Sequence, residues 1–511
     1  MAVTRLSFGR LFNIFLLLSV ADCQIPFVSD GNPILSNGTY YTADPGPIVV
    51  NGSLYIIAGH DSAPRDDNNF IINHWHLLAS DDPNPAGGKW KMYPDFVAPH
   101  TVFRWADTAA AYASQIVLGP DGGYYLYSPV SQSKTNSSDP FGIGVARADK
   151  IEGPYVDHHP RGPIVSQSYP APGNDIENID PTVLVDNDRV FMYWGTFGEL
   201  RGVELDKKDM STFVGDIVTV TSLNGFFEAA WLMKRGETYY MIYAANNVGK
   251  ECTPTLYHAC LAYGTSSGPL GPWTYRGVIL GIVSSTTSHS GAVAIKDQWY
   301  LVYHTADAHG GGNFRRSVAF DKMDFDDSTS PPRIRPVQQT HRPEPAPKST
   351  YQRQQLAVAS SSPPCIDRYW IEAVHDQKIP NNPLPPEYWS TYSDDGNIPV
   401  QSTVTYSWET EQELNGVGMS FFADSPAGSV EGVAPPTEWF VEYKSNNGSW
   451  TAVRNSTGYS TQVTTHPKTT NFDVIKTKGL RATLRAPTNG TWTAGVGIKE
   501  WLVYSTTKAV V

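Results

Sequence analysis

The sequence predicts an all-β protein: a five-bladed β-propeller followed by a β-sandwich that resembles a jelly roll. Three observations lead to this fold class. Helical periodicity is weak, and short apolar or alternating stretches separated by Gly, Pro, Asn and Asp recur instead. One unit, a strand, a turn with Gly or Asp and a Tyr-rich strand, returns five times in the first two-thirds of the chain. Further strand-like segments with aromatic edges continue towards the C-terminus.

Residues 1–23 are predicted to be a secretory signal peptide. Arg5 and Arg10 precede an apolar stretch, 11–20, and small residues lie at its end. This stretch is too short to span a bilayer as a stable helix, and a signal anchor is the alternative. We therefore expect a secreted, extracellular protein that has no membrane contact after cleavage.

The composition limits the class of ligand. The formal net charge is -12, and only 17% of the 511 residues are charged. Phosphate binding needs a basic stripe that this composition does not supply, so nucleic acid is excluded as a partner. The abundance of Trp, Tyr and Phe fits a neutral ligand.

The sequons and cysteines agree with secretion. Cys252 and Cys260 lie close together and are expected to form a disulfide, while Cys365 either remains a thiol or pairs with Cys23. No Cys/His spacing is typical of a zinc site, so no structural metal is predicted. Six Asn-x-Ser/Thr sequons occur, at Asn37, Asn51, Asn136, Asn447, Asn455 and Asn489.

Residues 24–340 contain the repeat and are predicted to form the propeller. Each copy has the pattern of an inner hairpin, and later segments add outer strands. A β-sandwich array would also give many short strands, but it would not place a polar residue at the same point of each repeat. The copies begin at Asp44, Ala106, Asp180, Glu228 and His289.

The residues that open four of these copies are expected to meet at one end of the propeller axis. Asp44, Asp180 and Glu228 would then share a funnel with His289. Hydrolysis of a glycosidic bond needs one protonated and one ionised carboxyl group, and a third carboxylate can raise the pKa of the acid. The set therefore predicts a glycoside hydrolase.

The chain from Asn32 to His341 resembles glycoside hydrolase family 43. Three motifs carry the resemblance: "NPILSNGTYYTADPGPIV", "IDPTVLVDNDRVFMYWG" and "FFEAAWLMKRGETYYMIYAA". The resemblance implies a five-bladed propeller acting mostly on arabinose- and xylose-containing polysaccharides. It also implies that Asp44 is the general base, Asp180 modulates a pKa and Glu228 is the general acid. The family more often has a Pro two positions after this Glu, where the chain has Ala230.

The same resemblance implies further site residues. His289 faces an ion or a water in the axial channel, and a calcium ion, a sodium ion or a water is its expected neighbour. Arg316, in preference to Arg315, reaches into the sugar site. Trp75 either is a platform for the sugar or packs in the core. The implied mechanism is inverting and needs no organic cofactor.

The C-terminal third is predicted to be a second domain. Residues 341–365 are rich in Pro, Gln and Ser and are predicted to be a linker, and 366–511 form the β-sandwich. The sandwich resembles the discoidin-like domains of secreted glycosidases and either binds carbohydrate or stabilises the enzyme. Because a Trp in a sandwich is more often a core residue, at most two are expected to touch sugar among Trp389, Trp439, Trp450, Trp492 and Trp501.

The predicted function is a secreted, inverting, exo-acting glycosidase of plant cell-wall polysaccharide, an α-L-arabinofuranosidase or a β-xylosidase. It is expected to act as a monomer on an oligosaccharide or polysaccharide. The alternatives are an endo-arabinanase, a galactan-directed exo-glycosidase and a catalytically silent carbohydrate-binding propeller.

Overall fold

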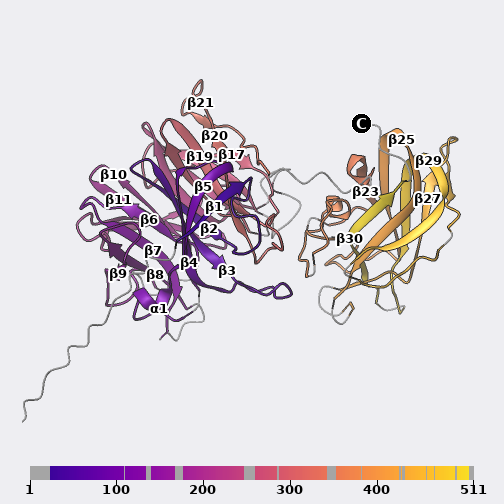
Figure 1. The fold of residues 1–511 in the computed structure, drawn as a ribbon, viewed down its shortest axis with the longest axis horizontal. Helices are drawn as coiled ribbons and strands as arrows, with labels where there is room; N and C mark the ends of the chain where they lie inside the picture. Colours follow the sequence, from indigo (N-terminus) through magenta and orange to yellow (C-terminus); the bar gives the residue numbers. More distant parts are fainter. Residues whose placement is uncertain are drawn as a thin grey trace, which may run out of the picture.

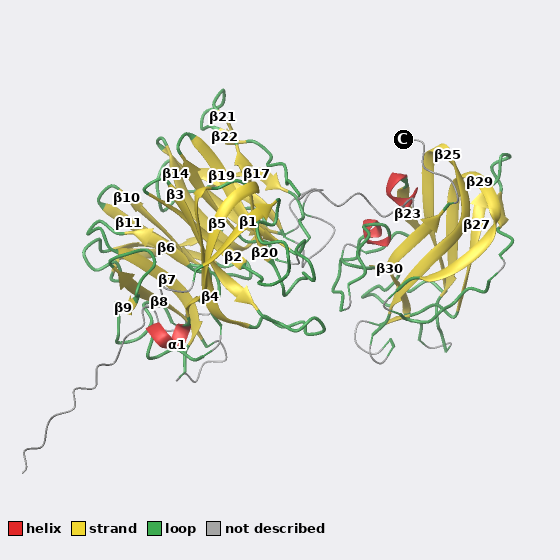
Figure 2. Ribbon diagram, in the orientation of Figure 1, coloured by secondary structure: helices red, strands yellow, loops and turns green. Residues whose placement is uncertain are grey.

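The protein is almost entirely β-structure, as predicted (Figure 2). The one α-helix among the described residues is the four-residue α1 (Pro99–Val102), and no described helix has the length and hydropathy of a membrane span. The computed structural model describes residues 24–108, 110–133, 140–166, 177–246, 252, 259–284, 287–341, 353–366, 368–380, 382–424, 427–428, 432–455, 457–464, 466–489 and 492–505. The predicted signal peptide, 1–23, lies outside these ranges.

The first domain is a five-bladed propeller (Figure 1). Blade 1 consists, in hydrogen-bonded order, of β1 (Ile25–Asp30), β5 (Ala86–Val97), β4 (Ile72–Asp82), β3 (Ser53–Asp61) and β2 (Ala43–Val50). Blade 2 consists of β6 (Gln115–Leu118), β7 (Tyr124–Ser131), β8 (Phe141–Ala148) and β9 (Val156–Asp157). Blade 3 consists of β10 (Thr182–Asp186), β11 (Arg189–Trp194), β12 (Leu200–Leu205) and β13 (Phe213–Val220).

The remaining two blades complete the circle. Blade 4 consists of β14 (Phe226–Arg235), β15 (Thr238–Ala245), β16 (Cys260–Ser266) and β17 (Thr274–Leu280). Blade 5 consists of β18 (Ser290–Ile295), β19 (Gln298–Thr305) and β20 (Ser317–Met323). The short ribbon β21 (Phe325–Asp326) and β22 (Arg333–Ile334) follows it. The innermost strands β2, β6, β10, β14 and β18 contact one another in a closed ring, because β18 also contacts β2.

Each blade packs against both neighbours through alternate side chains. Tyr239 belongs to the apolar cluster between blades 3 and 4, and the next residue, Tyr240, belongs to the cluster between blades 4 and 5. This alternation follows from the period of two along a strand. Five such clusters, one between each pair of blades, form the propeller core.

The segment 32–42 closes the ring by covering the free edge of blade 5. The Ile34 N–H donates to Val318 O (2.9 Å), and the Thr42 N–H donates to Arg316 O (2.7 Å). The side chain of Asn32 completes the edge, since its amide oxygen accepts the Phe320 N–H (3.1 Å). This segment leads directly into β2, so the first and last blades are hydrogen-bonded together beside the funnel.

The second domain is the predicted β-sandwich, drawn in orange and yellow in Figure 1. The strand order is β24 (Trp389–Ser390), β30 (Gly495–Tyr504), β25 (Gln401–Phe422), β29 (Lys468–Arg485), β27 (Glu438–Lys444) and β28 (Trp450–Ala452). In addition β26 (Val433–Ala434) pairs with β30, and β23 (Val358–Ser362) pairs with β25. Since β23 falls within 341–365, part of the predicted linker is a strand of the sandwich.

The tryptophans of the sandwich divide as expected. Trp389, Trp439 and Trp501 are buried in its core, whereas Trp450 is half-buried and Trp492 is 44% exposed. The predicted disulfide is confirmed, since Cys252 and Cys260 are bonded next to β16. The Cys365 thiol donates to Tyr369 O (3.2 Å). Cys23 lies outside the described residues.

Candidate active site

Asp44 is bound by a buried arginine that a second carboxylate holds in place. Arg316 Nη1 and Nη2 donate to the two carboxylate oxygens of Asp44 at 2.8 and 3.2 Å. Arg316 Nε and Nη2 also donate to Asp61, at 2.8 and 3.0 Å. Arg316 is only 2% exposed and Asp61 only 1%. Burial alone would raise the pKa of Asp44, but the charge of Arg316 and the contacts with His304 together outweigh burial and hold this pKa well below its usual range.

His304 fixes the backbone at Asp44. Its Nδ1 accepts the Asp44 N–H at 3.1 Å, and its Nε2 donates to Thr287 O at 3.0 Å. Nδ1 therefore faces the Asp44 N–H with its lone pair, and a hydrogen lies on Nε2. The Thr287 hydroxyl accepts a hydrogen bond from Arg316 (3.1 Å), so blade 5 holds both the backbone and the carboxylate of Asp44.

Glu228 is the candidate acid, and its surroundings favour its protonated form. Burial raises the pKa of Glu228 to about 7, the hydrogen bond from the Thr196 hydroxyl (2.8 Å) opposes this rise, and the negative charge of Asp44 adds to it. Asp44 and Glu228 therefore differ in protonation near neutral pH.

Asp180 joins blade 3 to blade 4 directly beside Glu228. Its carboxylate accepts the Ala229 N–H at 2.9 Å, and the residue is 6% exposed. Burial and the neighbouring charges of Glu228 and Asp44 raise the pKa of Asp180 well above its ordinary value. The structure thus brings Asp44, Asp180 and Glu228 into one electrostatically coupled group, as the repeat predicts.

The sequence predicts that the three acids occupy the same position of the repeat, but in the structure they do not. Asp44, Asp180 and Ala229 have left-handed backbone conformations, with φ of 51°, 55° and 57°. In each blade a second residue with positive φ begins the hairpin turn seven residues later. These turn residues are Asn51, Asn187 and Gly236. Glu228 therefore precedes the equivalent position by one residue, in a stretch where the register of β14 against β15 shifts.

His289 lies immediately before β18 and is half-buried. Burial lowers the pKa of His289 to about 4, although the charge of Asp44 opposes this, so the imidazole is neutral at pH 7. Among the described residues it shares its surroundings with Asp44, His304 and Arg316. One imidazole beside a carboxylate already paired with an arginine is a poor donor set for Ca²⁺, which takes six to eight oxygen ligands. We therefore derive no step through an axial ion.

Trp75 is a core residue, so the interpretation of its ring as a sugar platform is wrong. It is 0% exposed, and its Nε1 donates to Tyr112 O at 2.8 Å. A ring that is covered on both faces cannot stack on a sugar. Two phenylalanines at the site are accessible instead. Phe197, which follows Thr196, is 67% exposed, and Phe70, whose ring lies 4.9 Å from the Arg316 guanidinium, is 39% exposed.

Three residues that hold the site come from positions that the repeat does not mark, and two of them, Asp61 and Thr196, were not singled out from the sequence. Asp61 ends β3 and His304 lies in β19, so both come from second strands of a blade and not from the innermost ones. Thr196 follows β11 in the same way. The motif "AGHD" places Asp61 at the mouth of blade 1, and this was the available signal for it.

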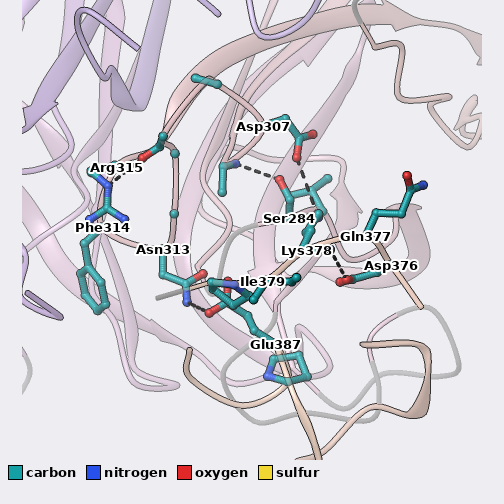
Figure 3. A pocket seen from close by; sticks show the side chains of 18 of the residues that line it. Ser284, Asp307, Asn313, Phe314, Arg315, Asp376, Gln377, Lys378, Ile379 and Glu387 are labelled. Atoms are coloured by element: carbon teal, nitrogen blue, oxygen red, sulfur yellow. Dashed lines mark hydrogen bonds and ion pairs between the residues drawn. The ribbon is translucent and has the colours of Figure 1, made fainter. Parts of the chain in front are cut away.

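A cavity of about 950 Å³ lies beside this region, between the propeller and the sandwich (Figure 3). Asn313 of the propeller donates to Glu387 of the sandwich at 2.8 Å, and Lys378 lies 3.9 Å from Asp307. Burial raises the pKa of Glu387 to about 7. The loop that contributes Asn313 ends at Arg316, and the residues that line the cavity do not include Asp44, Asp180 or Glu228.

Comparison with known proteins identifies the family. The model of glycosyl hydrolases family 43 matches residues 31–330, which is more than half of the chain. The chain belongs to glycosyl hydrolase family 43. As a family 43 protein it is a glycosidase, and carbohydrates are its substrates.

Individual relatives of this family 43 protein are moderately similar to it. A protein named xylosidase/arabinosidase from Bacteroides ovatus is 28% identical over 330 residues, covering 56% of this chain and 92% of the relative. Xylosidase/arabinosidase 43A from Humicola insolens is 28% identical over 349 residues, covering 58% and 96%. A solved structure described as an α-L-arabinofuranosidase from Clostridium thermocellum has 28% identity and a TM-score of 0.46, covering 60% and 96%.

Proposed function

We propose that this protein is a secreted, exo-acting, inverting glycosidase that removes terminal arabinofuranosyl or xylosyl units from plant cell-wall polysaccharide. The observation that carries the proposal is the opposite surroundings of two carboxyl groups in one site. Arg316 donates to both oxygens of Asp44 and favours its ionised form, whereas burial raises the pKa of Glu228 to about 7. The names of the relatives from Bacteroides ovatus and Humicola insolens support the class of sugar.

In the proposed reaction the glycosidic bond is displaced by water in one step. Asp44 removes a proton from the water while the water oxygen attacks the anomeric carbon. The bond from that carbon to the glycosidic oxygen breaks, and Glu228 transfers its proton to the departing oxygen. Asp180 acts as a positioning residue, because its bond to the Ala229 N–H orients the backbone next to Glu228.

The exposed rings at the site support a sugar as the ligand. Phe197 contacts Phe227 with 5.7 Å between ring centroids, and Phe227 directly precedes Glu228. We assign Phe197 as the aromatic surface on which a sugar face stacks, in the role first considered for Trp75. The Phe70 ring lies against the guanidinium of Arg316, which in turn donates to Asp44.

The surface supports secretion. Five of the six sequons lie in the described residues, and all five asparagines are exposed: Asn37, Asn51, Asn447, Asn455 and Asn489. Asn136 lies outside the described residues. Exposed sequons and the bond between Cys252 and Cys260 are typical of the oxidising secretory route. We propose that the secreted enzyme is a monomer.

Hydrolysis of aryl α-L-arabinofuranosides and aryl β-D-xylosides, together with arabinan and arabinoxylan, tests the proposal. Asp44→Asn should reduce kcat by about 10²- to 10⁴-fold on every substrate, because water activation is always needed. Glu228→Gln should cost most on natural glycosides and least on aryl glycosides, whose leaving groups need little protonation. Glu237→Gln, an exposed glutamate in the β14–β15 turn, is the matched control and should behave as wild type.

Two measurements decide between the alternatives. Proton NMR of the first-formed sugar should reveal the inverted anomer, and retention of configuration would contradict the proposed mechanism. Release of single sugars from chain ends supports exo action, whereas a rapid fall in polymer length favours the endo-arabinanase. Turnover of galactan alone favours the galactan-directed enzyme. Binding with no turnover of any of these sugars favours the silent propeller.

A further inference from the structure

Three histidines and one aspartate converge in blade 1 and have no part in the proposed reaction. His60 lies in β3, His74 and His76 lie on one face of β4, and Asp95 lies in β5. One nitrogen or oxygen atom from each of the four lies within 4.8 Å of those of the other three. The spacing of these residues in the sequence does not predict a metal site, because the cluster forms only when three neighbouring strands pair.

The side chains of His60, His74 and Asp95 contact one another directly. His60 Nδ1 lies 2.7 Å from His74 Nε2, and His74 Nε2 also contacts the carboxylate of Asp95. Only one hydrogen can lie between these nitrogens, so one proton on His74 Nε2 faces both a nitrogen lone pair and a carboxylate oxygen. A metal ion that replaces this proton would find three ligand atoms already directed at it.

His76 supplies the second observation. It is 0% exposed, and its Nδ1 accepts the Asp95 N–H at 3.1 Å, so its proton lies on Nε2. That buried Nε2 has no hydrogen-bond partner within the described part of the chain. Burying an N–H donor without an acceptor costs folding free energy. The centroid of the His76 ring lies 4.5 Å from that of His60 and 5.3 Å from that of His74. A water bound to a metal in the cluster would accept this hydrogen bond.

We propose that His60 Nδ1, His74 Nε2 and the Asp95 carboxylate bind one divalent transition-metal ion, zinc by preference, with a water as the fourth ligand. His76 then donates from Nε2 to that water and is not itself a ligand. Two imidazoles and one carboxylate form a donor set that suits Zn²⁺ and not Mg²⁺ or Ca²⁺.

The ligand atoms must move apart to receive the ion. Ligands at about 2.0–2.1 Å from a tetrahedral zinc are about 3.4 Å apart, so the 2.7 Å contact between His60 and His74 must open by about 0.7 Å, and the shorter contact between His74 and Asp95 must open further. On binding, the His74 proton moves from Nε2 to Nδ1. The ion would tie β3, β4 and β5 together next to Asp61, which holds Arg316.

Calorimetric titration of the full-length, untagged, chelator-treated protein with ZnCl₂ tests the proposal. We expect one equivalent of zinc to bind with a dissociation constant in the micromolar range or below, and the melting temperature to rise. Titration with CoCl₂ should give the intense visible absorption of a four-coordinate site. CaCl₂ and MgCl₂ should give no heat at the same concentrations.

Variants separate the site from adventitious histidine binding. Asp95→Asn removes a ligand whose side chain is 71% exposed, so the fold should persist while zinc affinity falls at least tenfold. His74→Ala should abolish the cobalt spectrum, and His100→Ala, at an exposed histidine outside the cluster, should bind as wild type. Hydrolysis of an aryl glycoside verifies that each variant is folded. Absence of zinc binding to the wild type, or unchanged binding by both cluster variants, would overturn the proposal.

Discussion

At the scale of single residues, Arg316 is held between two carboxylates. Asp61 uses both of its oxygens to fix the guanidinium, and the remaining N–H groups donate to Asp44 and to the Thr287 hydroxyl. Because Asp61 supplies the second negative charge, the buried group carries a net negative charge that Asp44 can use against a water proton. A lysine offers a point charge and no planar fork, so it cannot serve both carboxylates in this way.

Arg316→Lys should therefore move the acid limb of the pH profile. The pKa of Asp44 lies well below its usual range because of Arg316, and without the two-point contact it should return towards that range. We expect kcat/KM to decline at a higher pH on the acidic side, and kcat to fall by about tenfold or more. Arg315→Lys, one residue earlier, is the control, because the Arg315 side chain donates to Gly310 O and Pro64 O and not to the acids. Identical profiles for the two variants would refute this role of Arg316.

Asp180→Asn should move the alkaline limb instead. In this buried group ionisation of one acid disfavours ionisation of the other: the charge of Glu228 raises the pKa of Asp180, and Glu228 has a pKa of about 7. Asn cannot ionise, so Glu228 no longer competes with a second carboxylate, and kcat/KM should begin to decline at a lower pH than in wild type. A pH series on an unactivated disaccharide measures the shift. An alkaline limb that stays in place would show that Asp180 acts on the backbone of Ala229 alone.

At the scale of secondary-structure elements, the repeat predicts the inner hairpins and the residues near their starts. It does not predict the one-residue offset at Glu228, because a register shift within β14 leaves no mark in the order of residue types. Trp75 shows the same limit, since alternation along β4 does not say which face meets a neighbouring blade. The roles of Asp61 and His304 depend on contacts across 255 and 260 residues, which sequence spacing cannot reveal.

The disulfide beside β16 is expected to contribute measurably to stability. Cys252 and Cys260 are eight residues apart, and closing a loop of this size restricts the unfolded chain by about 2–3 kcal/mol in the chain-entropy model. Replacing both cysteines by Ala should lower the free energy of unfolding by about that amount in urea titrations. Cys365→Ala controls for loss of a thiol. If reductant lowers the stability of the double variant as much as that of wild type, the assigned bond is not the source.

At the scale of the whole molecule, a glutamate, Glu387, lies at the interface of the two domains, where burial disfavours its charged form. Glu387 accepts hydrogen bonds from Asn313 Nδ2 and the Leu384 N–H, and its pKa is raised from 4.5 to about 7. The folded protein therefore binds more protons than the unfolded chain between these values. Its stability declines as pH rises through this window.

Glu387→Gln should remove this pH dependence. We expect the melting temperature of wild type to fall more between pH 5 and pH 8 than that of the variant, as measured by calorimetry. Glu438→Gln, at a glutamate whose side chain is 62% exposed, should follow wild type. A variant that loses as much stability as wild type over this range would mean that Glu387 is not buried against the propeller in solution.

The way in which the ring is closed has a consequence for synthesis of the chain. Segment 32–42 leaves the ribosome early, yet its hydrogen-bond partners, residues 316–320, are made almost 300 residues later. Until then the growing propeller is an open arc whose two terminal strand edges have no pairing partner. Unpaired edges favour association between chains, and contacts so distant in sequence form slowly. Assembly of the site around Asp44 must therefore wait until blade 5 has been synthesised, because Arg316 and His304 belong to that blade.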